Sequence, residues 1–173
     1  MKILFLTICL TFALNITSAK AENFSFDKGK ITFDAPDDFA ALSPEIISIK
    51  YPSTHRPKFV IGNDSAKTTI AYDIKQHNIS KTPIDAVRQK LTEGLERSIP
   101  GLEWKKNTVL TFKGREWIYF EMTSNAIDTG IYNIMLFTPY GKKMLAFNFN
   151  STIDEIEQYK PVFYKSIESI AVK

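Results

Sequence analysis

Two histidines are the residues of this chain that could most directly serve as catalytic bases or metal ligands. His55 lies in a proline-rich segment, and His77 follows a predicted strand. A zinc-binding pair on a helix needs a second histidine one turn away, as in H-E-x-x-H, and the sequence contains no such pattern. We therefore interpret both histidines as exposed loop residues and predict no metal site.

Two pairs of adjacent carboxylates are the other acid–base candidates. Asp37-Asp38 follows the first predicted hairpin, and Asp154-Glu155 begins the last predicted helix. Catalytic carboxylates must converge across a cleft, whereas acidic neighbours at a helix start stabilise its positive end. We interpret Asp154-Glu155 as helix-capping residues, so neither pair indicates hydrolysis.

Motifs for nucleophilic catalysis and phosphate binding are missing from the sequence. There is no G-x-S-x-G elbow, no G-x-G-x-x-G and no P-loop. The glycines are spread singly, and Gly94, inside a predicted helix, is interpreted as a close packing contact. We predict that the protein is not an enzyme and needs no cofactor. A hydrolase that uses His55 or His77 in an unrecognised arrangement is the catalytic alternative.

The first residues have the composition of a targeting segment. Lys2 supplies a positive start, residues 3–16 are almost entirely apolar, and Ala19 with Ala21 forms an A-x-A cleavage site. The apolar run is shorter than the roughly 20 residues that span a bilayer. We predict a signal peptide over residues 1–21, cleavage near Ala21-Glu22, and a periplasmic or secreted protein with no integral membrane span.

Two alternatives to cleavage at that site exist. The apolar segment could be retained as an N-terminal anchor. The chain could also be a lipoprotein modified at Cys9, but Ile8 precedes this cysteine where a small residue is required. We favour the cleaved signal peptide over both.

The remaining residues, 22–173, have the size and charge of one self-sufficient domain. They contain no cysteine, so the fold depends on its core rather than on disulfides, which a domain of this size can sustain. They carry 20 basic and 19 acidic residues, a net charge of +1. A nearly neutral chain gives no electrostatic reason to bind nucleic acid or an anionic membrane. The richness in Lys, Asn and Ile suggests a bacterial periplasm.

The first half of this domain reads as short strands followed by a helix. Residues 24–33 alternate around a Lys-Gly turn and predict a hairpin, and residues 46–50 predict a further strand. Prolines interrupt residues 52–57. Two more strands are expected at residues 59–61 and 68–74.

Two amphipathic helices are expected. The first begins with Thr82 as cap and carries an apolar stripe made of Ile84, Val87, Leu91 and Leu95. The second begins with Thr152 as cap, and Pro161 predicts a kink or two abutting helices.

Between these helices, residues 108–149 predict a strand meander. Short turns join its four strands, which must therefore pair antiparallel. Residues 131–138 are apolar on both faces, as in a central strand. The expected fold class is α+β, an antiparallel sheet flanked by helices.

Several stretches of the meander and the last helix carry a resemblance to a known family. They are residues 109–117 (VLTFKGREW), 130–133 (GIYN), 143–149 (KMLAFNF), Phe163 and residues 165–170 (KSIESI). Their order and hydrophobic pattern resemble the PsbP/DcrB/Mog-like superfamily over residues 24–172. The resemblance implies an α/β/α sandwich and a single PsbP/DcrB-like domain over residues 22–173.

The resemblance also bears on function. Members of this superfamily include photosystem accessory subunits, nuclear-transport cofactors, periplasmic proteins and effector-loading chaperones. They share docking to other proteins and no common catalytic centre, so no catalytic residue can be transferred to this chain.

Aromatic and arginine side chains are the usual anchors of protein interfaces, and they guide the choice of candidate partner-binding residues. The preferred loop is residues 51–57, because its prolines preorganise an exposed segment. Trp104 is near an irregular segment, and two residues of the meander are expected on its outward face. The candidates are Tyr51, His55, Arg56, Trp104, Trp117 and Tyr119.

The sequence thus predicts a non-catalytic, exported, periplasmic protein-binding module whose partner is another protein. One specialised alternative is an immunity protein that neutralises an effector delivered into the periplasm. The other alternative is a carrier that holds a small ligand in a cleft between sheet and helix.

Overall fold

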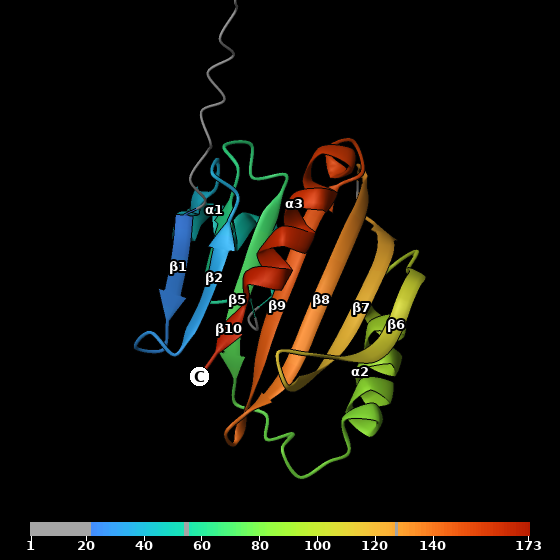
Figure 1. Cartoon of the computed structure of the whole chain (residues 1–173). Coiled ribbons are helices and arrows are strands. Elements are labelled where there is room, and N and C mark those ends of the chain that lie inside the picture. Colours follow the sequence, from blue (N-terminus) through green and yellow to red (C-terminus); the bar gives the residue numbers. More distant parts are fainter. Residues whose placement is uncertain (1–21, 54–55, 127) are drawn as a thin grey trace, which may run out of the picture.

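The computed structural model describes residues 22–53, 56–126 and 128–173, which form two antiparallel sheets and three helices (Figure 1). The predicted signal peptide over residues 1–21 lies outside the described residues, as does His55.

The large sheet contains the predicted meander. Its strands, in spatial order, are β3 (Ala40–Ala41), β4 (Phe59–Gly62), β5 (Thr69–Lys75), β9 (Lys143–Thr152), β8 (Gly130–Tyr140), β7 (Arg115–Asn125) and β6 (Glu103–Phe112). Every neighbouring pair is antiparallel. The central position of β8, predicted from its two apolar faces, is confirmed.

The opening hairpin belongs to a second, smaller sheet. Its order is β1 (Glu22–Phe26), β2 (Ile31–Ala35) and β10 (Ala171–Val172). Short loops join β1 to β2, and β10 follows the last helix, so the two ends of the described chain meet in this sheet.

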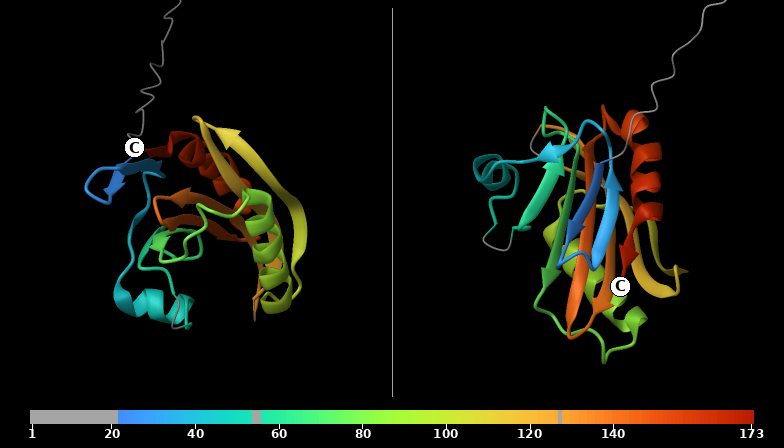
Figure 2. Two further views of the ribbon diagram at one scale, coloured as in Figure 1. Left: turned by 90° about the horizontal axis from the view of Figure 1, so that it is seen from below. Right: turned by 60° about the vertical axis from the view of Figure 1, so that its left-hand side comes forward.

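Helices and the small sheet cover the two faces of the large sheet (Figure 2). The alternation of side chains along β8 shows how the sequence supplies apolar residues to both faces. Ile134 and Leu136 pack in the core that includes α3 (Ile156–Ser169) and the small sheet. Met135 and Phe137 point the other way, toward the cluster under α2 (Ile84–Ser98). Since both faces are covered, the α+β prediction and the layered arrangement are confirmed.

The predicted strand at residues 46–50 is wrong, because this segment is a helix, α1 (Pro44–Lys50). Its start carries standard helix signals: the Ser43 hydroxyl accepts a hydrogen bond from the Ile46 amide at 3.4 Å, and Pro44 and Glu45 occupy the first turn. These signals outweigh the strand propensity of the isoleucines.

The two predicted helix caps are also wrong. Helix α2 begins after Pro83, with no side-chain cap, and α3 begins after Glu155 rather than at Thr152. The kink predicted at Pro161 is not a break: α3 is one helix through this residue. Phe163 and Ile167 of the same helix are buried in the core, and this packing offsets the hydrogen bond that the proline removes.

No helix in the described ranges is both long enough and apolar enough to cross a membrane.

Candidate functional site

Helix α1 lies at one end of the large sheet and exposes apolar side chains. None of its residues is buried. The side chains of Ile46 and Ile49 are 40% and 81% exposed. Most of the stability of a helix in a protein comes from burying an apolar face. This seven-residue helix leaves two isoleucines in solvent, so little of its possible apolar burial is used within the chain.

Beside these isoleucines is a hollow of about 700 Å³, which we call the α1 hollow. Its walls come from α1 (Ile46, Ile49 and Lys50), the turn at residues 64–67, residues 126, 128, 129 and 131 of the β7–β8 connection and β8, and Thr152 with Asp154. Segments distant in sequence therefore build one surface, because all these connections lie at the same end of the sheet (Figure 1).

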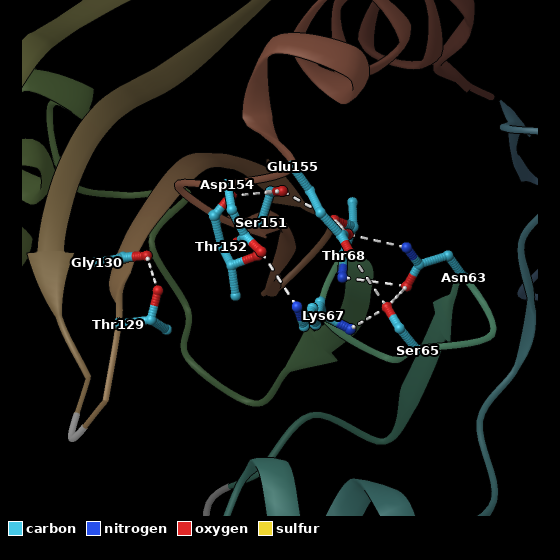
Figure 3. Close-up of polar contacts among 10 residues, drawn as sticks. All are labelled: Asn63, Ser65, Lys67, Thr68, Thr129, Gly130, Ser151, Thr152, Asp154 and Glu155. Atoms are coloured by element: carbon cyan, nitrogen blue, oxygen red, sulfur yellow. Dashed lines mark hydrogen bonds and ion pairs between the residues drawn. The ribbon is translucent and has the colours of Figure 1, made fainter.

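A hydrogen-bonded network centred on Glu155 fixes the floor of this end of the molecule (Figure 3). Glu155 Oε2 accepts hydrogen bonds from Thr68 Oγ1 at 2.6 Å and from Asn63 Nδ2 at 2.9 Å. Its Oε1 accepts one from Ser65 Oγ at 3.3 Å. The Thr68 hydroxyl also lies 2.8 Å from that of Ser151 on β9.

This network refines the interpretation of Asp154-Glu155 as capping residues, because Glu155 occupies the N-cap position of α3 but does not use its side chain as a cap. The Glu155 side chain reaches across to the β4–β5 turn instead of back to its own helix, and α3 has no side-chain cap bond. Asn63 stabilises the same turn from within, because its Oδ1 accepts from the Thr68 amide at 3.2 Å and from the Ser65 hydroxyl at 3.0 Å.

Charges of both signs surround the hollow. Lys67 Nζ lies 3.1 Å from Asp154 Oδ2, an exposed pair. The hydrogen bond to Asp154 raises the pKa of Lys67, and the nearby Thr152 hydroxyl together with Lys67 lowers the pKa of Asp154. Burial lowers the pKa of Lys50, although the charge of Glu155 opposes this effect. Asp64 and Asp128 are exposed and make the rim predominantly acidic.

The described residues of the loop predicted as the partner site, 51–53 and 56–57, lie elsewhere, on the α1–α2 face of the large sheet. Tyr51 is half-buried, its hydroxyl lies 3.2 Å from Thr69 Oγ1, and burial raises its pKa. Arg56 is half-buried and donates from Nε to the carbonyl of Ser53 at 3.1 Å. The contact with Thr69 holds Tyr51 against the sheet, whereas the Arg56 contact is internal to the loop.

The expectation that Trp117 and Tyr119 face outward is wrong. Their side chains are 1% and 6% exposed. Trp117 stacks on Phe112 at 5.0 Å between ring centres, and the Tyr119 hydroxyl donates to Glu121 at 3.1 Å. The small sheet and α3 cover this face, so neither residue can contact a partner in this conformation.

Trp104 is half-buried at the edge of the α2 cluster. Its ring centre is 5.1 Å from that of Phe120, and its indole N–H donates to Glu96 at 2.9 Å. Its strand, β6, is at the opposite edge of the large sheet from β3 and β4, the strands on either side of α1 in the sequence.

A second concave surface, which we call the open-face groove, lies on the α1–α2 face of the sheet and has a volume of about 310 Å³. The small side chains of Ala71 and Ala146 form its floor and leave space above the sheet. Met135 and Phe137 form one side. Tyr51 and Pro57, from the loop predicted as a binding site, line it as well. Lys75 and Asp73 at its rim form an ion pair at 2.9 Å.

Sequence reasoning missed Ile46 and Ile49 because it placed them in a strand. The signal that could have found them is Ser43-Pro44-Glu45, a helix start directly before two isoleucines three residues apart. Across residues 22–53, 56–126 and 128–173 there is no cluster of three or more His, Cys, Asp and Glu side chains that could hold a metal ion. The described histidine, His77, is exposed.

Comparisons with known proteins give structural matches only. No family model matches the chain, and no curated protein matches it. PsbP (CyanoP) from Synechocystis sp. PCC 6803 is similar with a TM-score of 0.65 at 14% identity, over 95% of this chain and 99% of that chain. LpqN of Mycobacterium tuberculosis, described as involved in cell envelope biogenesis, is similar with a TM-score of 0.60 at 14% identity, over 89% and 91%.

A protein of unknown function and putative regulator from Pseudomonas aeruginosa has a TM-score of 0.56 at 11% identity, over 88% of this chain and 97% of that chain. These likenesses show that the chain has the PsbP-type α/β fold, as the sequence resemblance implied.

Proposed function

We propose that this chain is an exported, non-catalytic module that binds another protein through the α1 hollow and the isoleucines beside it. The observation that carries the proposal is the exposure of Ile46 and Ile49 on a helix that has no fully buried residue. Contiguous apolar side chains with a polar rim are the usual mark of a protein-binding surface. The PsbP-type fold and the involvement in cell envelope biogenesis stated for LpqN support a binding role in an exported compartment.

The chemistry of the surface defines the partner. Ile46 and Ile49 can receive an apolar anchor, and the hollow beside them can hold it. The exposed carboxylates of Asp64 and Asp128 favour basic residues around that anchor. A toxic effector delivered into the periplasm is the specialised form of such a partner, and an immunity protein would occupy it through this surface.

The test is capture from the native periplasmic extract with the exported protein and two variants. Ile49→Asp places a charge in the centre of the surface, and Thr111→Asp places the same charge on an exposed residue of the edge strand β6. We expect the original protein and Thr111→Asp to retain one stoichiometric partner and Ile49→Asp to lose it. Equal capture by all three proteins would exclude this surface.

The immunity alternative has its own test. The product of an adjacent toxin gene should form a stable complex with this protein at micromolar concentration, and Ile49→Asp should abolish both the complex and protection of the cell. If the toxin product does not bind, the partner belongs to another class.

A specific observation favours a second candidate function, a carrier of small ligands in the open-face groove. The Asn148 side chain lines the groove, and its buried Oδ1 has no hydrogen-bond partner in the described chain. An unsatisfied buried acceptor costs about 1–3 kcal/mol. An apolar ligand with one polar group would satisfy it.

A thermal-shift titration with the neutral probe N-phenyl-1-naphthylamine tests the carrier function. Ala146→Leu should fill the groove and remove the shift, whereas Ala40→Leu, on an exposed residue of β3, should keep it. An absent shift in the original protein, or an equal shift in both variants, would remove this candidate.

A further inference from the structure

The antiparallel topology sorts the loops of this protein onto two ends. The β1–β2, β6–β7 and β8–β9 turns and the C-terminus lie at one end, shown in the lower part of Figure 1. The β4–β5 and β7–β8 turns and the start of α3 lie at the other end. Successive turns of the meander therefore lie at opposite ends of the large sheet.

The lower end, which we call the basic end, gathers positive charge from every one of those turns. Its cations are Lys28, Lys30, Lys113, Arg115, Lys142, Lys143 and Lys173. All the lysines are exposed. Four of them, Lys30, Lys142, Lys143 and Lys173, line one hollow of about 480 Å³.

These cations are not neutralised by neighbours. In the described parts of the chain, no ion pair joins any of the seven to a carboxylate; the pairs involve other residues. Negative charge at this end comes from Glu116, the C-terminal carboxylate, Asp73 and Asp27. Asp73 is paired with Lys75, and Asp27 accepts a hydrogen bond from the Tyr140 hydroxyl. Positive charge therefore exceeds negative charge at the basic end.

The opposite end carries more exposed carboxylates than cations. Asp37-Asp38, Asp64, Asp128 and Asp154 are exposed there beside Lys50 and Lys67, and Lys67 is paired with Asp154. The net charge of +1 on residues 22–173 thus hides a separation of charge along the strand direction. A net charge close to zero gives no reason to bind an anionic membrane, but the separated positive charge at the basic end does give one.

We propose that the basic end binds the headgroups of an anionic lipid bilayer. A cluster of four to eight lysines is enough for such binding, because each lysine near the surface strengthens it about fivefold. The occupant is a bilayer rather than a protein because the exposed large apolar side chains of the described chain all lie elsewhere, on α1, β4, the β9–α3 connection and α3. A protein interface needs an apolar centre and is poor in lysine.

This orientation leaves the α1 hollow directed away from the bilayer, since the two lie at opposite ends of the same strands. The membrane proposal does not depend on the partner proposal, because no cation of the basic end lines the α1 hollow.

The test is vesicle co-sedimentation of the protein purified from its exported fraction, with its N-terminus determined by mass spectrometry. One set of vesicles is pure phosphatidylcholine, and the other contains one-third phosphatidylglycerol. We expect binding to the anionic vesicles alone, and we expect its loss on raising the salt from about 0.1 M to about 1 M, where the screening length falls from about 10 Å to about 3 Å.

Two charge-reversal variants locate the surface. Lys142→Glu with Lys143→Glu should weaken binding at least about tenfold. Lys90→Glu with Lys165→Glu makes the same change in net charge on exposed helix residues outside the basic end and should leave most binding intact. Equal effects of the two pairs, equal binding to neutral vesicles, or no binding to anionic vesicles would each overturn the proposal. Retention of binding in excess inorganic phosphate supports a bilayer, and complete competition by phosphate would contradict it.

Discussion

Lys160 Nζ on α3 lies 3.1 Å from Glu121 Oε1 on β7, and this pair ties the last helix to the sheet. Glu121 is a mostly buried carboxylate that also accepts hydrogen bonds from the Tyr119 and Tyr132 hydroxyls. Lys160 Nζ lies 5.0 Å from the centre of the Tyr132 ring. One carboxylate thus serves three donors from three elements.

Replacing Glu121 with alanine should destabilise the protein by about 2–4 kcal/mol, because two buried hydroxyls and an ammonium group lose their acceptor. Urea unfolding followed by circular dichroism would measure this. Glu116→Ala, on an exposed residue of the same strand, is the matched control and should change the free energy of unfolding by less than about 0.5 kcal/mol. Similar losses in both variants would mean that the buried network is not what stabilises this end of α3.

The contribution of the Glu121–Lys160 pair to the stability of the fold depends on pH. Burial alone would raise the pKa of Glu121, but hydrogen bonds from Tyr132, Lys160 and Tyr119 outweigh burial and hold it below its usual value. A carboxylate with a lowered folded-state pKa stabilises the fold above its unfolded pKa of about 4.3 and loses that effect as the pH falls through the folded value.

The pKa of Lys160 is shifted in the opposite direction. Burial opposes its charge, but the bond to Glu121 raises its pKa, so its contribution is present below the unfolded value and is lost as the pH rises through the folded value. The difference in stability between the original protein and Glu121→Ala should therefore be constant near neutral pH and shrink below about pH 4. A difference that stays constant down to about pH 2 would contradict the assignment.

The alternation rule predicted part of this arrangement from sequence. It correctly placed Trp117, Tyr119 and Glu121 on one face of their strand. It could not tell which face was outward, because both are covered: one by the small sheet and α3, the other by α2. The burial of an aromatic–acidic face follows from long-range pairing of the two chain ends, which no local window contains.

The candidate site shows the same division. The sequence identified the segment at residues 51–57, of which Tyr51 and Pro57 line the open-face groove. It did not identify the α1 hollow, because this surface forms only when the β4–β5 turn, the β7–β8 connection and α1 meet at one end of the sheet. Glu155 was recognised as acidic and near a helix start, but its partners are about ninety residues earlier, at Asn63 and Thr68.

Two glycines should respond to alanine in opposite directions. A Cβ at Gly94 would meet nothing within 4 Å, so the predicted close contact is wrong, and Gly94→Ala in the middle of α2 should stabilise the protein by about 0.5–1 kcal/mol. A Cβ at Gly62 would lie 2.8 Å from the Thr68 carbonyl oxygen, so Gly62→Ala should destabilise it by about 1–3 kcal/mol. Thermal unfolding of both variants would test this, and equal signs would contradict the packing described.

The Glu155 network should govern the order of the β4–β5 turn. Glu155→Ala removes an acceptor for three side chains and should cost about 1–3 kcal/mol, with faster amide exchange at Ser65 to Thr68. Glu157→Ala changes an exposed residue in the first turn of α3. It is the control and should leave this exchange unchanged. Unchanged exchange in the Glu155 variant would show that the backbone bonds alone hold the turn.

The central claim is that a partner protein contacts Ile49. Site-specific incorporation of a photo-cross-linking amino acid at position 49, and separately at the exposed position 111, tests it in the native cell. We expect one discrete cross-linked protein at position 49 and none at position 111. No adduct at position 49, with the protein folded and exported, would contradict it.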